Sequence, residues 1–359
     1  MGLHQNFAPR WGLSTPLWPI RYKPLPDELL SSWLVRLAHG HGLKVQTFCN
    51  LLFGNQLQVW NRDIDRLAPA WLIDGLVEGT GTSRERALAT TLRVFEGLLY
   101  PRYRESGNLP WLLALKIFHR RREGFGQQFC IGCLRDDATP YFRKLWRLGL
   151  VTCCRRHDCM LEDRCPHCGE PVSFFRIDMG QLELSDRFTS VHCFHCHRPL
   201  SEGTLRPIPA ADASARAWLT ETVEEVESAS RGGAVVLRAT DLAVFRNLSK
   251  LLLTRRRTVK LLEHVGESLG RPQLGLPAGK RLDFESLPIE TRHEVLVRGA
   301  WLMADLHHRL DDAVRARAIR YSHLVRDFPG MPTEFGDVAR SLLRRKLPQP
   351  FRADSHRGH

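Results

Sequence analysis

Four short segments between residues 130 and 196 decide the fold: CIGC (130–133), CRRH (154–157), CPHC (165–168) and CFHC (193–196). In each segment two residues with a sulfur or imidazole ligand are separated by two others. This spacing places both side chains on one tight turn, which we call a knuckle. Two knuckles supply the four ligands of a tetrahedral zinc site. The four knuckles therefore predict two such sites in residues 130–196.

The simplest pairing of the knuckles follows the chain. The first site would then be formed by Cys130, Cys133, Cys154 and His157, and the second by Cys165, Cys168, Cys193 and Cys196. Interleaved pairing has the same spacings and stays open, as does replacement of Cys154 by Cys153. Because four thiolates complete the second site, the neighbouring histidines are expected to be surface or outer groups: His167, His192, His195 and His197.

Both predicted zinc ions are expected to be structural. A catalytic zinc keeps one position open for water, whereas each of these sites has a full set of ligands rich in thiolate. Structural zinc contributes about 10–16 kcal/mol to the folding of small zinc domains. Of the remaining cysteines, Cys49 is expected to be a small buried hydrophobe, Cys153 is the alternative ligand, and Cys159 has no evident role.

The totals indicate a basic, globular protein. The chain has 359 residues, 43% of them hydrophobic, and a formal net charge of +13. A charge of this sign favours polyanionic partners, of which nucleic acid is the commonest. No apolar run approaches the ~20 residues of a membrane span, and no secretion signal is visible, so a cytoplasmic protein without disulfides is expected.

The composition divides the chain into four expected parts. These are an extended N-terminal arm (1–26), a helical domain containing a helix-turn-helix (27–125), a double zinc-finger domain (126–205) and a helical C-terminal domain (206–359). The expected fold class is mainly α with small β elements. The two tandem four-ligand zinc fingers are expected to be zinc-ribbon-like or treble-clef-like.

Hydrophobic periodicity places the expected helices. Asp27 is predicted to be the N-cap of a helix that runs to about His39, and glycines break the chain before a second helix that ends at Gly54. Helix, short turn, helix is the outline of a helix-turn-helix. Further helices are expected at 69–79, 83–99, 110–122, 213–229, 239–253, 255–269, 286–322 with a break, and 333–346.

The sequence contains no Walker lysine loop, no GxSxG and no HExxH, so the NTPase, hydrolase and metalloprotease classes lack their motifs. Asp63 and Asp65 resemble a carboxylate pair for Mg²⁺, but helix capping is the preferred interpretation. A basic cluster is by default a solvated helix face, as for Arg340 with residues 344–346. In a chain this basic, however, phosphate contact is predicted for Lys44, Arg120, Arg121, Arg122, Arg255, Arg256 and Arg257.

Several motifs resemble the TniQ/TnsD family of bacterial transposon proteins. The helix PDELLSSWLVRLA (26–38) resembles the first helix of that family, and FCIGCL (129–134) its first knuckle. YFRKLWRL (141–148) is similar to the strip that follows, and the knuckles at 154–157 and 165–169 match the next two in order. The resemblance covers about residues 20–200. In the C-terminal half, DFPG (327–330) resembles a late turn of the family.

The resemblance implies a target-site selection adaptor without enzymatic activity. Such proteins carry a helix-turn-helix and paired zinc fingers, bind target DNA or a Cascade-type RNA-guided complex, and recruit an AAA+ ATPase. The ATPase in turn engages a DDE transposase, so the transposase is an indirect partner. A homodimer is also compatible with the resemblance. The chain lacks the long C-terminal extension of TnsD-type site readers and looks closer to the TniQ proteins of mercury-resistance-type transposons.

Two alternatives belong to other classes of protein. A zinc-containing helix-turn-helix transcription regulator would use the same motifs to bind one operator, and neighbouring transposase and ATPase genes would argue against it. A zinc-dependent nuclease would need catalytic carboxylates, for which Asp63 and Asp65 are the candidates.

Overall fold

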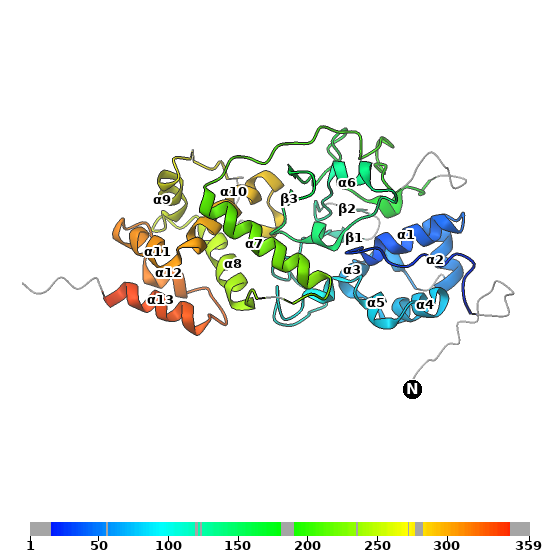
Figure 1. Ribbon diagram of the computed structural model, residues 1–359, viewed down its shortest axis with the longest axis horizontal. Helices are drawn as coiled ribbons and strands as arrows, with labels where there is room; N and C mark the ends of the chain where they lie inside the picture. The colour runs from blue at the N-terminus through cyan, green and yellow to red at the C-terminus, as the bar shows by residue number, and fades with distance from the viewer. Residues whose placement is uncertain are drawn as a thin grey trace, which may run out of the picture.

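The computed structural model describes residues 16–54, 57–118, 121–122, 124–180, 190–234, 236–271, 273–276 and 283–344. Figure 1 shows an elongated molecule with the first helices at one end and the last at the other. The short strands lie between them, among the cysteine-rich segments. The fold class expected from the sequence, mainly α with small β elements, is confirmed. Within the described residues no helix is both long and apolar enough to cross a bilayer.

The α-helices, in chain order, are α1 (Leu30–Gly40), α2 (Val45–Phe53), α3 (Ile64–Leu67), α4 (Ala70–Thr80), α5 (Arg84–Leu88), α6 (Ile131–Asp136), α7 (Ala213–Ser230), α8 (Ala239–Leu252), α9 (Leu261–Ser268), α10 (Ile289–Ala304), α11 (Leu306–Arg315), α12 (Tyr321–Val325) and α13 (Thr333–Arg344). Short 3-10 turns are η1 (Val59–Asn61), η2 (Leu92–Phe95), η3 (Lys144–Arg147), η4 (Phe174–Arg176) and η5 (Phe284–Ser286). Two antiparallel hairpins pair β1 (Ile117–Phe118) with β2 (Arg121–Arg122), and β3 (Cys153–Cys154) with β4 (Cys159–Met160).

Helix α1 is buried along most of its length, which follows from its apolar pattern: Leu30, Trp33, Leu34 and Leu37 are fully buried. The prediction that Asp27 is its N-cap is wrong, because the helix begins at Leu30 with Leu29 as N-cap. Asp27 has a φ of 60°, and its carboxylate accepts hydrogen bonds from outside the helix. The first turn of α1 is capped instead by a side chain distant in sequence, since the Ser31 amide donates to the Asp65 carboxylate at 2.7 Å.

Helix α2 follows α1 after a four-residue turn and ends at Gly54, as predicted. The third expected helix is also present as α4, but Gly79 lies inside it rather than beyond its end. Gly79 meets a spatial need, because a Cβ there would come within 1.9 Å of the Trp18 ring. The helix ends instead at Gly81, whose φ of 61° is left-handed.

Two expected helices are wrong. The segment 83–99 forms only α5 and η2, because the hydroxyls of Thr90 and Thr91 bond to the preceding carbonyls at the point where the helix would continue. The segment 110–122 contains no helix, and its described end forms the β1–β2 hairpin. Its backbone pairs with a distant strip instead, since Leu113 donates to Arg147 and Gly149 donates to Trp111.

In the C-terminal half the expected helices are present with changed limits. Helices α7 and α8 match the predictions at 213–229 and 239–253, and the long segment 286–322 is broken into α10, α11 and α12, as expected. Helix α9 begins at Leu261 rather than 255, so the arginines at 255–257 lie in a loop. Helix α7 packs along α10 and α8 and points toward the N-terminal helices (Figure 1).

Candidate metal centres

The first cluster is assembled from two knuckles on different elements. Cys130 precedes α6 and Cys133 lies in its first turn, while Cys154 ends β3 and His157 lies in the turn before β4. Their ligand atoms all lie within 4.8 Å of one another, and the sequential pairing is the one that the structure forms. The Cys133 amide donates to the Cys130 Sγ at 3.4 Å, which fixes the first knuckle locally.

The distances in this cluster fit one tetrahedral ion. With Zn–S near 2.3 Å and Zn–N near 2.0–2.1 Å, the edges of a tetrahedron are about 3.8 Å between sulfurs and about 3.5 Å between sulfur and nitrogen. The Cys133 and Cys154 sulfurs are 3.7 Å apart. The His157 Nδ1 lies 3.4–3.5 Å from each of the three sulfurs. The four side chains are thus already in the arrangement that a zinc ion requires.

Neighbouring groups orient the histidine of this cluster. The His157 Nε2 faces the Asp136 carboxylate at 3.1 Å, an arrangement common around metal-bound imidazoles. Gly132 gives the ring its space, because a Cβ at this position would lie 2.6 Å from the ring of His157. Cys159, which had no role in the sequence, is buried opposite Cys154, and its sulfur lies 3.8 Å from that of Cys130.

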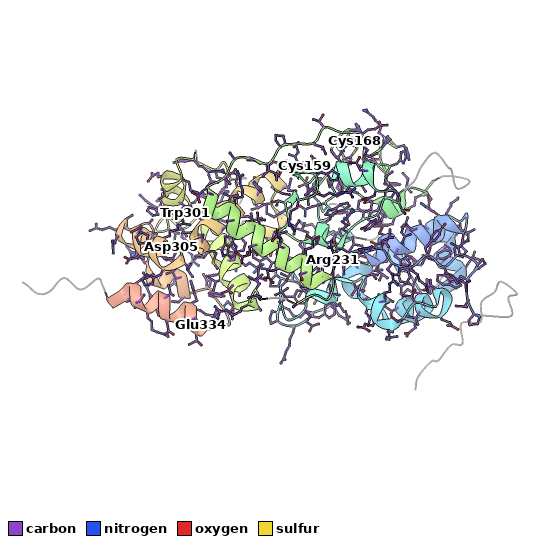
Figure 2. All side chains as sticks on the ribbon, in the orientation of Figure 1. Cys159, Cys168, Arg231, Trp301, Asp305 and Glu334 are labelled. Carbon is purple, nitrogen blue, oxygen red and sulfur yellow. The ribbon has the colours of Figure 1, made fainter. Side chains whose placement is uncertain are left out.

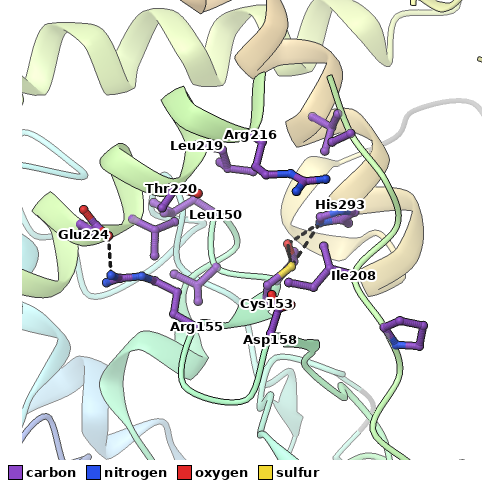
Figure 3. Close-up of a pocket in the computed structure, with 16 residues that line it drawn as sticks. Leu150, Cys153, Arg155, Asp158, Ile208, Arg216, Leu219, Thr220, Glu224 and His293 are labelled. Atoms are coloured by element: carbon purple, nitrogen blue, oxygen red, sulfur yellow. Dashed lines mark hydrogen bonds and ion pairs between the residues drawn. The ribbon is translucent and has the colours of Figure 1, made fainter. Parts of the chain in front are cut away.

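The choice between Cys153 and Cys154 is settled by the alternation of side chains along β3. Cys154 faces the cluster, while Cys153 faces a cavity of about 420 Å³ bounded by β3, the segment 207–211, α7 and α10. There its sulfur lies 3.6 Å from the Nδ1 of His293. Figure 3 shows this contact, with the Arg155–Glu224 ion pair across the cavity.

The second cluster contains four cysteines. Its sulfur–sulfur distances are 3.7 Å between Cys165 and Cys196 and 3.6 Å between Cys168 and Cys193, again close to a tetrahedral edge. In both knuckles an amide donates to the first sulfur at 3.4 Å. This cluster is more open than the first, because Cys168 is exposed and Cys196 is half-buried. Cys168 and Cys159 are labelled in the upper part of the cysteine-rich block in Figure 2.

The neighbouring histidines do not belong to either cluster, in agreement with the sequence prediction: His167, His192, His195 and His197. The ring of His167 bonds to the Pro199 carbonyl at 2.9 Å, and His195 lies 3.8 Å from the carboxylate of Glu170. These contacts link the two knuckles from outside.

The carboxylate pair considered for Mg²⁺ is a buried structural cluster. Asp63 caps α3 by accepting from the Arg66 amide, as the capping interpretation predicted. Both carboxylates accept hydrogen bonds from Arg147, at 2.5 Å for Asp63 and 3.2 Å for Asp65. Burial, followed by the charge of Asp63, raises the pKa of Asp65 to about 6. The two aspartates therefore anchor the strip after α6 to the N-terminal helices.

A further carboxylate that sequence reasoning missed joins the cysteine-rich block to α2. The side chain of Asp178 accepts from the Val45 amide at 2.9 Å and lies 3.1 Å from the His39 Nε2. It is thus the cap of α2, supplied from 133 residues away. No local pattern around Asp178 indicates this partner, since capping normally involves residues within the same turn.

The residues predicted to contact nucleic acid do not form one surface. Lys44 is half-buried at the start of α2, and the exposed loop 255–257 lies toward the opposite end of the molecule (Figure 1). Arg121 and Arg122 lie between these ends in β2, whereas Arg120 is outside the described residues. In the last basic cluster, Arg340 pairs with Asp337, and residues 345–346 are outside the described residues.

These features define a helical protein with two thiolate-rich clusters positioned to hold metal ions. The TniQ family model matches residues 19–161, so this part of the chain is a TniQ domain, and the resemblance noted in the sequence is confirmed. The domain associates the protein with transposition. The matched range includes the whole first cluster and ends before the second. No curated protein matches the chain.

Proposed function

We propose that this protein is a non-enzymatic adaptor that selects the target site in DNA transposition. The observation that carries the proposal is the TniQ domain at residues 19–161, which contains a complete four-ligand cluster. As proposed, the adaptor links target DNA, or a Cascade-type RNA-guided complex, to an AAA+ ATPase in the cytoplasm. Through the ATPase it acts on the transposase, and it works as a homodimer.

Both clusters are proposed to hold structural zinc. Thiolate and imidazole ligands at tetrahedral distances are the donor set that zinc prefers in proteins. Because each ion would have four protein ligands, no position is left for a water or a substrate. The Asp63–Asp65 pair supports the same interpretation, since its oxygens are engaged by Arg147 and Ser31. The zinc ions would therefore stabilise the fold.

The proposed division of labour follows the four parts expected from the sequence. Residues 27–125 would contact DNA or the guide complex through the α1–α2 pair and Lys44, and Arg120–Arg122 would contact phosphate near the cysteine-rich part. Arg255–Arg257 would contact DNA from the C-terminal part, which would also provide a face for the ATPase. The proposed zinc-finger part, residues 126–205, would hold these regions together.

Adjacent cysteines provide a matched test of the zinc assignment. Cys154→Ser removes a ligand of the first cluster, whereas Cys153→Ser changes the neighbouring thiol that faces the cavity. We expect wild type and Cys153→Ser to contain two equivalents of zinc by mass spectrometry of the metal, and Cys154→Ser to contain at most one. Two retained zinc ions in Cys154→Ser would contradict the assignment.

Function is tested by an insertion assay with the cognate ATPase, transposase and candidate target DNA. We expect the wild-type protein to direct insertion to a defined site and Cys165→Ser to lose this targeting together with its second zinc. A Cys165→Ser protein that has lost one zinc and still directs insertion normally would refute the structural role. Random insertion in the presence of the wild-type protein would refute target selection.

A further inference from the structure

Two loops of the C-terminal half present a concentration of exposed cations. One loop joins α8 to α9 and the other joins α11 to α12. They and the end of α12 carry five exposed basic side chains without an ion-pair partner among the described residues. These side chains are Arg257, Lys260, Arg317, Arg320 and Arg326. We call this set the C-terminal basic surface.

The two loops lie against each other, although they are about sixty residues apart in sequence. The Lys260 amide donates to the Ala318 carbonyl at 2.8 Å, which joins the backbones. The Thr258 hydroxyl lies 3.3 Å from the His323 Nε2, and Arg256 pairs with Asp327 at 2.6 Å. Arg256 therefore fixes the geometry of the loops, while its neighbours remain available to an external anion.

The lack of carboxylate partners distinguishes this surface from other basic positions. Exposed arginines elsewhere are paired, such as Arg84 with Asp74, Arg238 with Asp241 and Arg340 with Asp337. Pairing cancels most of the local field, whereas clustered unpaired cations produce a positive potential that attracts polyanions. The C-terminal basic surface thus concentrates part of the excess positive charge of the chain.

A buried histidine beneath the loops reports this positive field. His323 is buried below the loops, where Thr258, Arg256, Arg320 and Arg326 face it from the two loops and α12. Burial lowers the pKa of His323, and the charges of Arg320, Arg256 and Arg326 lower it further. An anion bound over these arginines would offset their charge and raise the pKa of His323.

We propose that the C-terminal basic surface binds the phosphate backbone of double-stranded DNA. The proposal rests on the proposed function and adds a site that the sequence pattern alone did not assemble. Cations spread over two loops match a row of phosphates better than a single small anion. Proteins that bind single strands use exposed aromatic rings for stacking. Tyr321 is only half-buried, and the exposed large hydrophobic residues of the described chain lie outside this surface, which favours a duplex.

The test measures how duplex affinity depends on salt. The zinc-loaded full chain is titrated into a labelled 30-base-pair duplex over a range of KCl concentrations, with single-stranded DNA and RNA of equal length in parallel. The test variant is Arg317→Gln/Arg320→Gln/Arg326→Gln. A charge-matched control, Arg84→Gln/Arg238→Gln/Arg340→Gln, removes three exposed arginines that are paired with carboxylates.

Each lost phosphate contact reduces the slope of log K against log[salt] by about 0.9. We expect the test variant to lose two to three contacts, with at least about a tenfold lower affinity near 0.1 M salt. The control should keep the wild-type slope. In the wild-type protein, duplex DNA should also raise the pKa of His323 measured by NMR.

Two results would overturn the inference, and they differ in what they say about the proposed function. If the wild type binds duplex and directs insertion, but the test variant keeps its affinity and slope, only the assignment of this surface fails. If the wild type prefers single-stranded RNA or does not bind duplex at low salt, direct DNA binding fails with it. In the latter case site-directed insertion through a guide complex would still support the adaptor role.

Discussion

At the residue scale, long-range ionic contacts carry much of the specificity of this fold. Asp65 is buried between the Ser31 amide and Arg147, so that one carboxylate caps α1 and also binds the strip before β3. Asp27 plays a similar part at the other end of the strip, where it accepts from the Ser230 hydroxyl at 2.9 Å. Neither partner can be identified from the residues that surround the aspartates in sequence.

Asp65 should give the stability of the protein a characteristic pH dependence. Its pKa is about 6 in the folded chain, above the ordinary value of 3.8, so the folded state binds the proton more tightly. Its contribution is therefore largest below pH 4 and is lost as the pH rises through 6. Between pH 5 and 6 the unfolding free energy of wild type relative to Asp65→Asn should fall by about 1 kcal/mol. Parallel curves in urea titrations would show that Asp65 does not titrate in this way.

At the scale of elements, local patterns predicted the knuckles and most of the helices, because ligand spacing and amphipathic periodicity are read within a few residues. The errors occur where tertiary contacts replace the helical hydrogen bonds. Trp111 and Leu113 pair with the backbone at 147–149, so an apolar run that looks helical is extended. The loop 255–257 was also placed in a helix that begins only at Leu261.

The first two helices have the outline of a helix-turn-helix, but the start of α2 is occupied. In proteins of that class, the N-terminal residues of the second helix contact base edges. Here the Asp178 carboxylate binds the Val45 amide and is almost completely buried. The exposed face of α2, with Gln46 and Thr47, is the part available for contact. That this pair reads DNA stays a prediction.

Replacement of Asp178 tests its role as a cap. Asp178→Ala should lower the unfolding free energy by about 1–2 kcal/mol, because α2 loses a charged cap and its amide is left without an acceptor. Asp178→Asn should retain part of the effect, since the amide oxygen can still accept. The measurement is urea unfolding followed by tryptophan fluorescence. Equal stability of wild type and Asp178→Ala would show that water replaces the cap without cost.

At the scale of the whole molecule, the two clusters differ in their connection to the core. Cys130, Cys133 and Cys154 are buried within the continuous hydrophobic core, whereas the second cluster includes the exposed Cys168. Sequence spacing could predict that two clusters exist and which residues form them. It could not predict this difference, because burial depends on the helices that pack around each cluster.

The difference predicts an order of metal loss. Under reducing conditions a chelator should remove zinc from the second cluster first, with little change in far-ultraviolet circular dichroism. Loss from the first cluster should follow more slowly and should be accompanied by unfolding of the surrounding helices. Simultaneous release of both metals in one transition would contradict the predicted order. Cys168→Ser, which should leave only the slow phase, assigns the fast phase to the second cluster.

The ammonium group of Lys144 has a consequence for how this protein can be divided and recombined. It donates to the carbonyls of Ala89 and Ser230 and lies 3.9 Å from Asp27, so three distant stretches of chain meet at one charge. Ser230 ends α7, well beyond the matched TniQ range. A chimera that exchanges the C-terminal half between relatives should therefore keep α7 with the N-terminal partner, because a junction before it would separate a buried charge from its acceptor.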